Sequence, residues 1–198
     1  MSFLDKTPDL ETYWRSIILF GKNSASYKFA LAKSLIELGS SEQELISLED
    51  LAEPFAQHIC CHLKNNAAQT TQRPGKFLKA CMAYNSQEIG LDELITQAKK
   101  EGFRYVIENF HIVNQDNLPR LFFLDERKQN GGIRITDDFF NMLEEGHAGD
   151  LGEEVEARWR LVETAWSLGI SRNLASIQHD EELGLLYAGV AERRITVT

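Results

Sequence analysis

The sequence predicts a mainly α-helical protein, with one compact multi-helix domain over residues 1–198 and one small β-hairpin at about residues 119–136. Three observations predict this class. Apolar residues recur at intervals of three and four along most of the chain, capping residues and glycines mark the ends of those segments, and strand-type residues flank a polar turn once. A length of 198 residues with 43% hydrophobic residues is sufficient for one core.

The first two predicted helices surround a short junction. The first covers residues 8–20 and begins at Thr7, a favoured cap residue that acidic residues follow. The second begins at Asn23 or Ser24 and runs to about Leu38. Because the second helix is apolar around most of its circumference, we expect it to lie at the centre of the core.

Helical spacing returns along the rest of the chain, except at the predicted hairpin. Ser47, with Asp50 three residues later, makes a cap-like start, and Pro54 indicates that a longer helix begins afresh there. The polar run at residues 65–75 has no periodicity and predicts a mobile loop. The helices expected after the second one cover residues 54–65, 76–85, 91–102, 105–110, 137–145 and 155–169, with a short helix between residues 180 and 192.

The order of these elements divides the single domain into three parts. Residues 1–115 form a helical part, residues 116–145 form the hairpin with its following helix, and residues 146–198 form C-terminal helices. A Gly-rich break, "GHAGDLGEE", separates the last two parts. The sequence ends on "RRITVT", which alternates like a strand.

The charge balance argues against a surface broadly suited to nucleic acid. Thirty acidic residues against twenty-one Lys and Arg give a net charge of −9, whereas nucleic-acid-binding domains carry a basic patch or stripe. A local basic patch is compatible with this total. The three cysteines form no CxxC pair, and neither a signal sequence nor a membrane span is present, so we expect a cytoplasmic protein without a membrane partner.

The junction sequence "GKNS" looks like the end of a phosphate-binding loop. That motif, GxxxxGK[ST], needs a glycine five positions before Gly21 and Ser or Thr after Lys22, but this chain has Ser16 and Asn23 there. A helix rather than a strand also precedes the junction. We therefore interpret it as the turn between two helices.

Four cations are candidates for contact with nucleic-acid phosphates: Arg15, Lys22, Lys28 and Arg172. Lys22 and Lys28 flank the start of the second helix, where the helix dipole favours an anion. Two other interpretations of these lysines are favoured over phosphate contact, namely pairing with an internal carboxylate or simple solvation, because these are the more common outcomes for charged side chains.

His58 and His62 are the candidates for a metal site within this chain. They lie four residues apart in "HICCH", a spacing that lets two imidazoles on one helix face share a metal. The Glu that follows the first His in a metalloprotease is absent, and no further ligand pair lies nearby. The favoured interpretation is therefore a helix with two ordinary histidines.

Two further patterns allow a chemical and a structural interpretation. Asp116, Glu126 and Lys128 have a spacing seen in nucleases that hold magnesium, but they also fit a solvated hairpin. Trp159 and Trp166 could stack on bases, yet aromatic residues at helical spacing among valines usually belong to a core. In both cases the structural interpretation is favoured.

Three stretches carry a family resemblance: "YWRSIILFGKNSASYKFALAKSLIEL", "RLFFLDERKQNGGIRITDDFF" and "EVEARWRLVETAWSLGISRNL". They resemble the N-terminal helical region of bacterial HNH endonuclease-domain proteins, and the resemblance covers nearly the whole chain. It implies that a segment like "RRITVT" leads into an HNH module, which would follow Thr198 and hold the divalent metal and the general-base His. No position of this sequence matches the HNH motif, so no catalytic residue is assigned to it.

The resemblance implies a non-catalytic domain of an HNH-type DNA endonuclease, in a defence or restriction system, that positions DNA or a partner subunit. The alternative is a protein-interaction or regulatory helical module that makes no contact with nucleic acid. The net charge of −9 and the acidic segment "DLGEEVE" favour this alternative.

Overall fold

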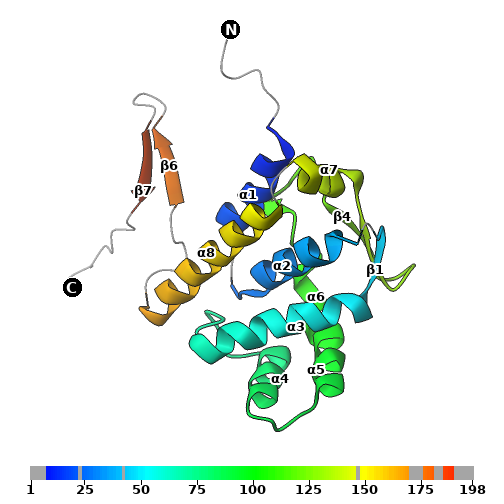
Figure 1. The fold of residues 1–198 in the computed structure, drawn as a ribbon. Coiled ribbons are helices and arrows are strands. Elements are labelled where there is room, and N and C mark those ends of the chain that lie inside the picture. The colour runs from blue at the N-terminus through cyan, green and yellow to red at the C-terminus, as the bar shows by residue number, and fades with distance from the viewer. Residues whose placement is uncertain are drawn as a thin grey trace, which may run out of the picture.

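Helices make up most of the protein, as the sequence predicts (Figure 1). The computed structural model describes residues 8–21, 24–41, 43–145, 148–169, 176–180 and 185–189. In chain order the helices are α1 (Leu10–Phe20), α2 (Tyr27–Gly39), α3 (Leu48–Asn65), α4 (Lys76–Asn85), α5 (Leu91–Gln97), the π-helical turn η1 (Ala98–Gly102), α6 (Phe103–Val106), α7 (Asp137–Glu145) and α8 (Ala148–Ser167). The mainly α fold class is confirmed. No helix in these ranges combines the length and the apolar character of a membrane span.

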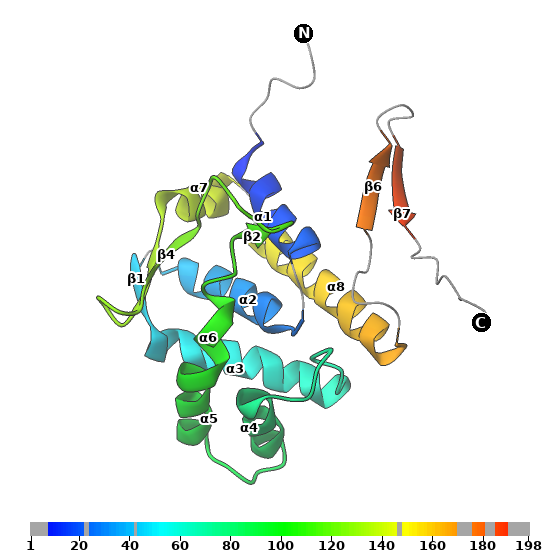
Figure 2. The same cartoon turned by 180° about the vertical axis from the view of Figure 1, so that it is seen from behind.

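Helix α2 lies at the centre of this arrangement, between α3 and α8 (Figures 1 and 2). Most of its side chains are buried, and Phe29, Leu31 and Leu35 have no exposed surface. Lys33 and Glu37 lie four residues apart on the remaining, polar face. The predicted central position is confirmed, because an apolar helix with one narrow polar stripe needs neighbours on several sides.

An aromatic cluster joins α1 to the hairpin region. Trp14 on α1 packs at centroid distances of 5.8, 5.3 and 5.7 Å against the rings of Phe110, Phe122 and Phe139. These contacts are tilted or edge-on, which is the favoured geometry for aromatic pairs. Residues of the predicted hairpin part therefore share one core with the helices that precede them.

The predicted hairpin belongs to a larger sheet than expected. Strands β4 (Phe123–Glu126) and β5 (Gly132–Ile135) pair in antiparallel fashion, as predicted. Strand β1 (Leu45–Ser47) pairs with the other edge of β5, giving the order β1-β5-β4. Two short strands, β2 (Ile112–Val113) and β3 (Asp116–Asn117), form a second antiparallel pair.

The caps of the first two helices differ from the prediction. Helix α1 begins two residues later than expected and is capped by Asp9, whose carboxylate accepts a first-turn backbone N–H at 2.7 Å. Thr7 lies outside the described residues. Helix α2 has Ser26 at its cap position instead of Ser24, without a side-chain capping bond, and Asn23 is also outside the described residues.

The helix expected to begin at Pro54 is part of a longer one. Helix α3 begins after Ser47, whose hydroxyl accepts the backbone N–H of Asp50 at 3.1 Å, and continues through Pro54 without a break. Proline removes the backbone bond to the carbonyl of Asp50, but Asp50 is exposed and water can replace that donor. Farther along, α5 continues through η1 into α6, so the separate helix at residues 105–110 was also a wrong prediction.

Helix α8 begins earlier than predicted, inside the Gly-rich break. It starts at Ala148, and its first turns bury Leu151 and Val155 against the core. Burial of these two side chains, four residues apart, offsets the low helix propensity of the glycines around them. The helix ends as predicted before Gly169, which has a φ of +66°.

The C-terminal part contains strands where a short helix was expected. Strand β6 (Ser176–Asp180) pairs with β7 (Leu185–Gly189) in antiparallel register, so backbone bonds between the two segments replace those within a helix. The predicted helix between residues 180 and 192 is therefore wrong. The strand-like residues 193–198 lie outside the described residues.

Replacing Gly132 with alanine should separate β1 from β5. Gly132 pairs with Ser47, and a Cβ at position 132 would overlap the backbone carbonyl of Ile46, which cannot move without breaking the strand pair. We expect a loss of about 1 to 3 kcal/mol in the free energy of unfolding, as for other overpacked sites, measured by chemical denaturation. Gly152→Ala in α8 is the control, because nothing lies within 4 Å of a Cβ there and alanine should add about 0.5 to 1 kcal/mol. Equal unfolding midpoints for the two variants would contradict this account.

Candidate nucleic-acid interface

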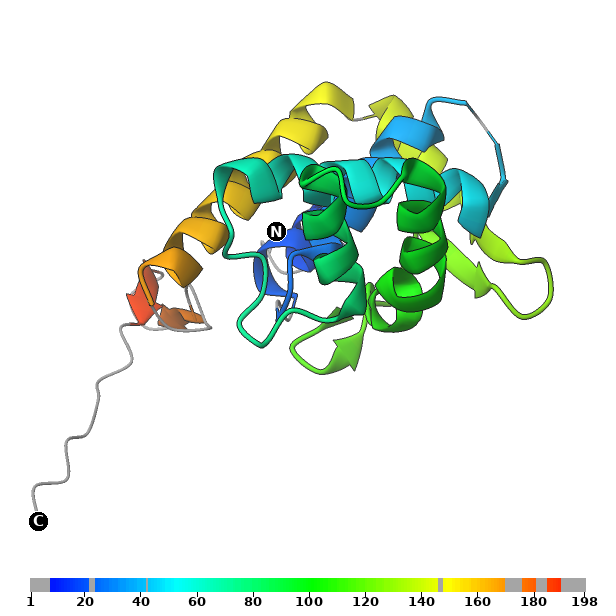
Figure 3. The same cartoon turned by 90° about the horizontal axis from the view of Figure 1, so that it is seen from below.

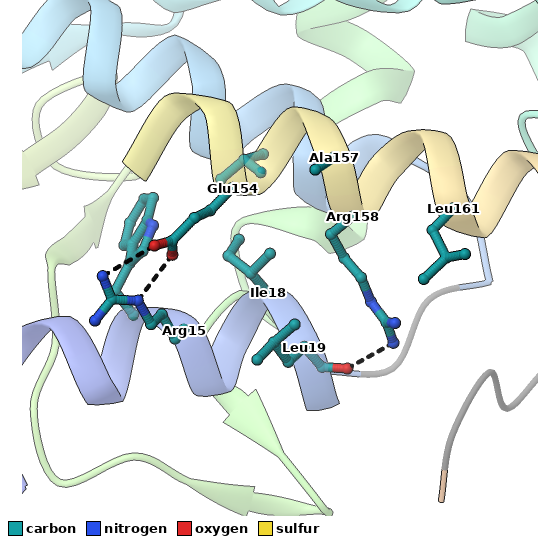
Figure 4. Close-up of a pocket in the computed structure, with 9 residues that line it drawn as sticks. Arg15, Ile18, Leu19, Glu154, Ala157, Arg158 and Leu161 are labelled. Carbon is teal, nitrogen blue, oxygen red and sulfur yellow. Dashed lines mark hydrogen bonds and ion pairs between the residues drawn. The ribbon is translucent and has the colours of Figure 1, made fainter. Parts of the chain in front are cut away.

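Arg15 lies on α1 and is held by two glutamates. Its Nε donates to Glu154 Oε2 at 2.8 Å and its Nη2 to Glu154 Oε1 at 3.0 Å (Figure 4). Its Nη1 lies 2.8 Å from Glu11 Oε2. The hydrogen bonds and charge of Glu154 raise the pKa of Arg15. A phosphate would therefore have to compete with two carboxylates for this guanidinium group.

Lys28 is buried in the first turn of α2 and is only 5% exposed. Its ammonium group lies against Gly21, and within the described residues no carboxylate forms an ion pair with it. Burial lowers the pKa of Lys28 to about 8. The two favoured interpretations of this lysine, an internal carboxylate partner and solvation, are thus both wrong. Lys22 and Arg172 lie outside the described residues, so phosphate contact by these two stays a prediction.

The two candidate metal ligands, His58 and His62, face carboxylates rather than a shared metal position. His58 Nε2 lies 3.2 Å from Glu37 Oε2. His62 lies between two acids, with Nδ1 3.0 Å from Glu163 Oε2 and Nε2 3.2 Å from Glu156 Oε2. Across the part of the chain that the structure describes, no three His, Cys, Asp or Glu side chains converge in the manner of a metal site.

The two remaining patterns have structural roles. Glu126 accepts hydrogen bonds from Arg134 at 2.9 Å and from Asn130 at 2.5 Å, so its carboxylate is engaged within the hairpin. Trp159 has no exposed surface, and Trp166 packs partly buried against the core. These tryptophans therefore belong to the core, as favoured.

A polar cluster around His62, Gln69 and Glu163 is buried where α3, α8 and the 66–75 loop meet. Gln69 has no exposed surface; its Nε2 donates to Glu163 Oε2 at 2.6 Å, and its Oε1 accepts from Trp159 Nε1 at 2.9 Å. The ring of His62 stacks on Trp159 with a centroid distance of 3.6 Å. The loop that was predicted to be mobile is thus anchored in the core by Gln69.

Glu156 links this cluster to the polar stripe of α2. Lys33 Nζ donates to Glu156 Oε2 at 2.5 Å, and Arg160 Nε donates to Glu156 Oε1 at 2.7 Å. Burial alone would raise the pKa of Glu156, but the hydrogen bonds from Lys33 and Arg160 and the charge of His62 lower it to about 2. This carboxylate is therefore ionised at neutral pH, and the cations that donate to it balance its charge.

An apolar groove of about 450 Å³ lies between α1 and α8 (Figure 4). Ile18, Leu19, Val155 and Leu161 line it, and Leu19 and Leu161 are 40% and 50% exposed. The Arg15 and Glu154 pair closes one end, and Arg158 donates to the carbonyl of Leu19 at 2.9 Å along the floor. The groove offers apolar contact but no exposed group suited to catalysis.

Five exposed cations lie on two segments that pack together, and we call this surface the basic face: Arg73, Lys76, Lys79, Lys100 and Arg104. It combines the loop before α4 and the start of α4 with η1 and α6. Lys76 Nζ lies 3.5 Å from Glu101 Oε1, which joins the two segments at the surface. Beneath the surface, Phe55 packs 5.3 Å from Phe77 on α4 and 4.6 Å from Phe103 on α6. Figure 3 shows α4 and α5 side by side in front of α3.

The cations of the basic face are less neutralised than those elsewhere. Among the described residues, Arg73, Lys79, Lys100 and Arg104 have no carboxylate within ion-pair distance. By contrast, six cations on other surfaces besides Arg15 pair with an acid: Lys33, Lys99, Arg120, Arg127, Arg134 and Arg160. Lys64 and Lys128 are exposed at separate places without an acidic partner among the described residues. The basic face is therefore a local positive region in a chain of net charge −9.

The start of α4 adds to this positive potential. Gly75 occupies the cap position, no side chain caps the helix, and no acidic residue lies in its first turn. The helix dipole and the free backbone N–H groups at such an end favour an anion. Sequence analysis missed this surface, although "RPGKFLK" and "KKEGFR" together carry six cations and one acid.

Comparison with known protein families, with curated proteins and with solved structures found no match for this chain. The geometry of its own residues is therefore the basis for a functional proposal.

Proposed function

We propose that this chain is a non-catalytic helical domain that positions nucleic acid for a nuclease module of the HNH type. The observation that carries the proposal is the basic face, where four of five exposed cations lack an acidic partner among the described residues. The sequence resemblance supplies the nuclease context and implies a module that follows Thr198. That module, rather than these residues, would supply the metal and the cleavage chemistry.

The charge distribution favours one orientation on a phosphate backbone. Lysine and arginine that neutralise phosphates release condensed counterions, which is the main source of non-specific affinity for DNA. The remaining surface of a chain with net charge −9 is repelled by the same backbone. Attraction at one face combined with repulsion elsewhere would dock the domain in a defined direction, as a positioning role requires.

Removing the basic face should abolish most of this affinity. We expect the quadruple variant Arg73→Ala, Lys79→Ala, Lys100→Ala and Arg104→Ala to bind a DNA duplex on the order of 100-fold more weakly than the wild type at low salt. Fluorescence anisotropy with a labelled duplex measures this change. All four side chains are exposed, so the fold should survive, which circular dichroism checks.

The matched control removes similar charges from other places. Lys64 at the end of α3 and Lys128 in the β4–β5 turn are exposed and have no acidic partner among the described residues. The double variant Lys64→Ala, Lys128→Ala should therefore retain affinity within about threefold of the wild type. If the wild type does not bind at low salt, or if control and quadruple variants weaken equally, the proposed role of the basic face is wrong.

The alternative, a protein-interaction module without nucleic-acid contact, is favoured by the groove between α1 and α8. Leu19 and Leu161 present apolar surface there, which is typical of protein contacts rather than of phosphate binding. A folded protein that binds no oligonucleotide at low salt, and that loses a copurifying partner on the change Leu161→Asp, would support this alternative instead.

A further inference from the structure

Tyr105 is the most exposed aromatic side chain among those whose burial the structure describes, with 64% of its surface accessible. It lies on α6 within the basic face, directly after Arg104. The guanidinium carbon of Arg104 lies 5.2 Å from the centre of the Tyr105 ring, a cation–π contact that leaves the phenol side chain largely open. The ring of Tyr105 and the guanidinium group of Arg104 are thus exposed together, among the cations that we propose bind phosphate.

The backbone holds Tyr105 in this outward position. Two residues on the inner side of α6, Phe103 and Val106, have only 1% and 9% of their surface exposed. Their burial holds this helical turn against the core. The carbonyl of Tyr105 accepts hydrogen bonds from the backbone N–H and the side-chain Nδ2 of Asn109, at 3.1 and 2.8 Å. A tyrosine has few rotatable bonds, so little freedom remains for the ring to lose when a ligand stacks on it.

We propose that Tyr105, with Arg104, is a stacking platform for an unpaired base, so that the basic face prefers single-stranded or locally unpaired nucleic acid to an intact duplex. This inference rests on the proposed function. Bases inside a duplex already stack on each other, whereas an unpaired base can place its face on an aromatic side chain. The cations around the ring would meanwhile hold the phosphates of the same strand.

The spatial order of these groups fits such a strand. Glu101, which contacts Lys76 and so joins the two halves of the basic face, precedes Tyr105 by four residues along the chain. Lys100 and Arg104 are likewise four residues apart, and both are exposed. A backbone bound along these cations would bring its bases within reach of the ring.

The test compares oligothymidylate with a duplex of equal length, for wild type and for Tyr105→Ala. We expect Tyr105→Ala to weaken binding of the single strand by about tenfold or more and to leave duplex affinity unchanged. Tyr105→Phe, which keeps the ring, should bind like the wild type. Phe20→Ala, which removes an aromatic ring that is 40% exposed on α1, is the matched control and should change nothing.

The outcomes separate the two proposals. A single-strand preference that Tyr105→Ala removes and Tyr105→Phe retains supports the platform. Equal affinities of wild type and Tyr105→Ala for the single strand overturn the platform while the basic face still binds phosphate. Loss of binding to both nucleic acids in the quadruple variant of the basic face, with single-strand binding unchanged in Tyr105→Ala, supports phosphate binding and overturns stacking. Absence of any binding by the wild type at low salt overturns the proposed function itself.

Discussion

Replacing Glu163 with alanine should destabilise the fold by about 3 to 5 kcal/mol, the range for removing one partner of a buried charged group. Glu163 is 6% exposed, and its Oε2 faces both His62 Nδ1 and the Nε2 of Gln69. The change leaves the buried His62 ring and an amide N–H without this acceptor. It also releases Gln69, which ties the 66–75 loop to Trp159.

Urea denaturation of the wild type and three variants tests this expectation. Glu163→Gln keeps an acceptor oxygen of similar shape and should lose less than half as much stability as Glu163→Ala. Glu153→Ala, at an exposed position on the same helix, is the matched control and should stay within about 0.5 kcal/mol of the wild type. A result for Glu163→Ala that matches this control would show that the polar cluster contributes little to stability.

Replacing Lys28 with methionine should stabilise the protein by about 3 kcal/mol at pH 7. The pKa of Lys28 falls from an ordinary value of 10.5 to about 8 because burial disfavours the ammonium form. Each unit of that shift corresponds to about 1.4 kcal/mol. Methionine fills a similar volume without a charge, so the desolvation cost disappears while the buried space beside Gly21 stays filled.

The pH dependence has a definite sign. Below pH 8 Lys28 is protonated in both the folded and the unfolded state, and the whole cost of burial is present. Between pH 8 and about 10 the folded state loses its proton first, so the wild type gains stability as pH rises. The gap between wild type and Lys28→Met should therefore be largest near pH 7 and should narrow by pH 9.5, measured by thermal or chemical unfolding. A gap that is constant over this range would contradict the assignment of the shift to Lys28.

Local signals explain which elements the sequence predicted well. Helices α4 and α7 have the bounds expected from periodicity. The residues that start and end each of these helices lie at or next to its own ends, so no distant part of the chain is needed to predict them. Strand β1 was missed because its three residues gain their backbone partners only from β5, far along the chain. The start of α8 was missed because the burial of Leu151 and Val155, rather than local propensity, decides it.

The candidate site was harder to predict, for a related reason. Arg15 and Lys28 were chosen from the chemistry of helix ends, but their surroundings depend on residues elsewhere, namely Glu154 for Arg15 and the burial of α2 for Lys28. Gln69 lies in a polar run from which the sequence predicted only a loop, and its buried role depends on its hydrogen bonds to Trp159 and Glu163 of α8, about 90 residues farther along the chain. The basic face combines two segments that are ordinary by themselves and that the Phe55 contacts bring together.

The salt dependence of duplex binding tests the central claim most directly. For a protein that neutralises phosphates, the logarithm of the association constant falls linearly with the logarithm of salt concentration, by about 0.9 for each phosphate contact. We predict a steep slope for the wild type and a slope that is shallower by about 3 to 4 for the quadruple variant of the basic face. A wild-type slope near zero, or equal slopes for the two proteins, would contradict the account.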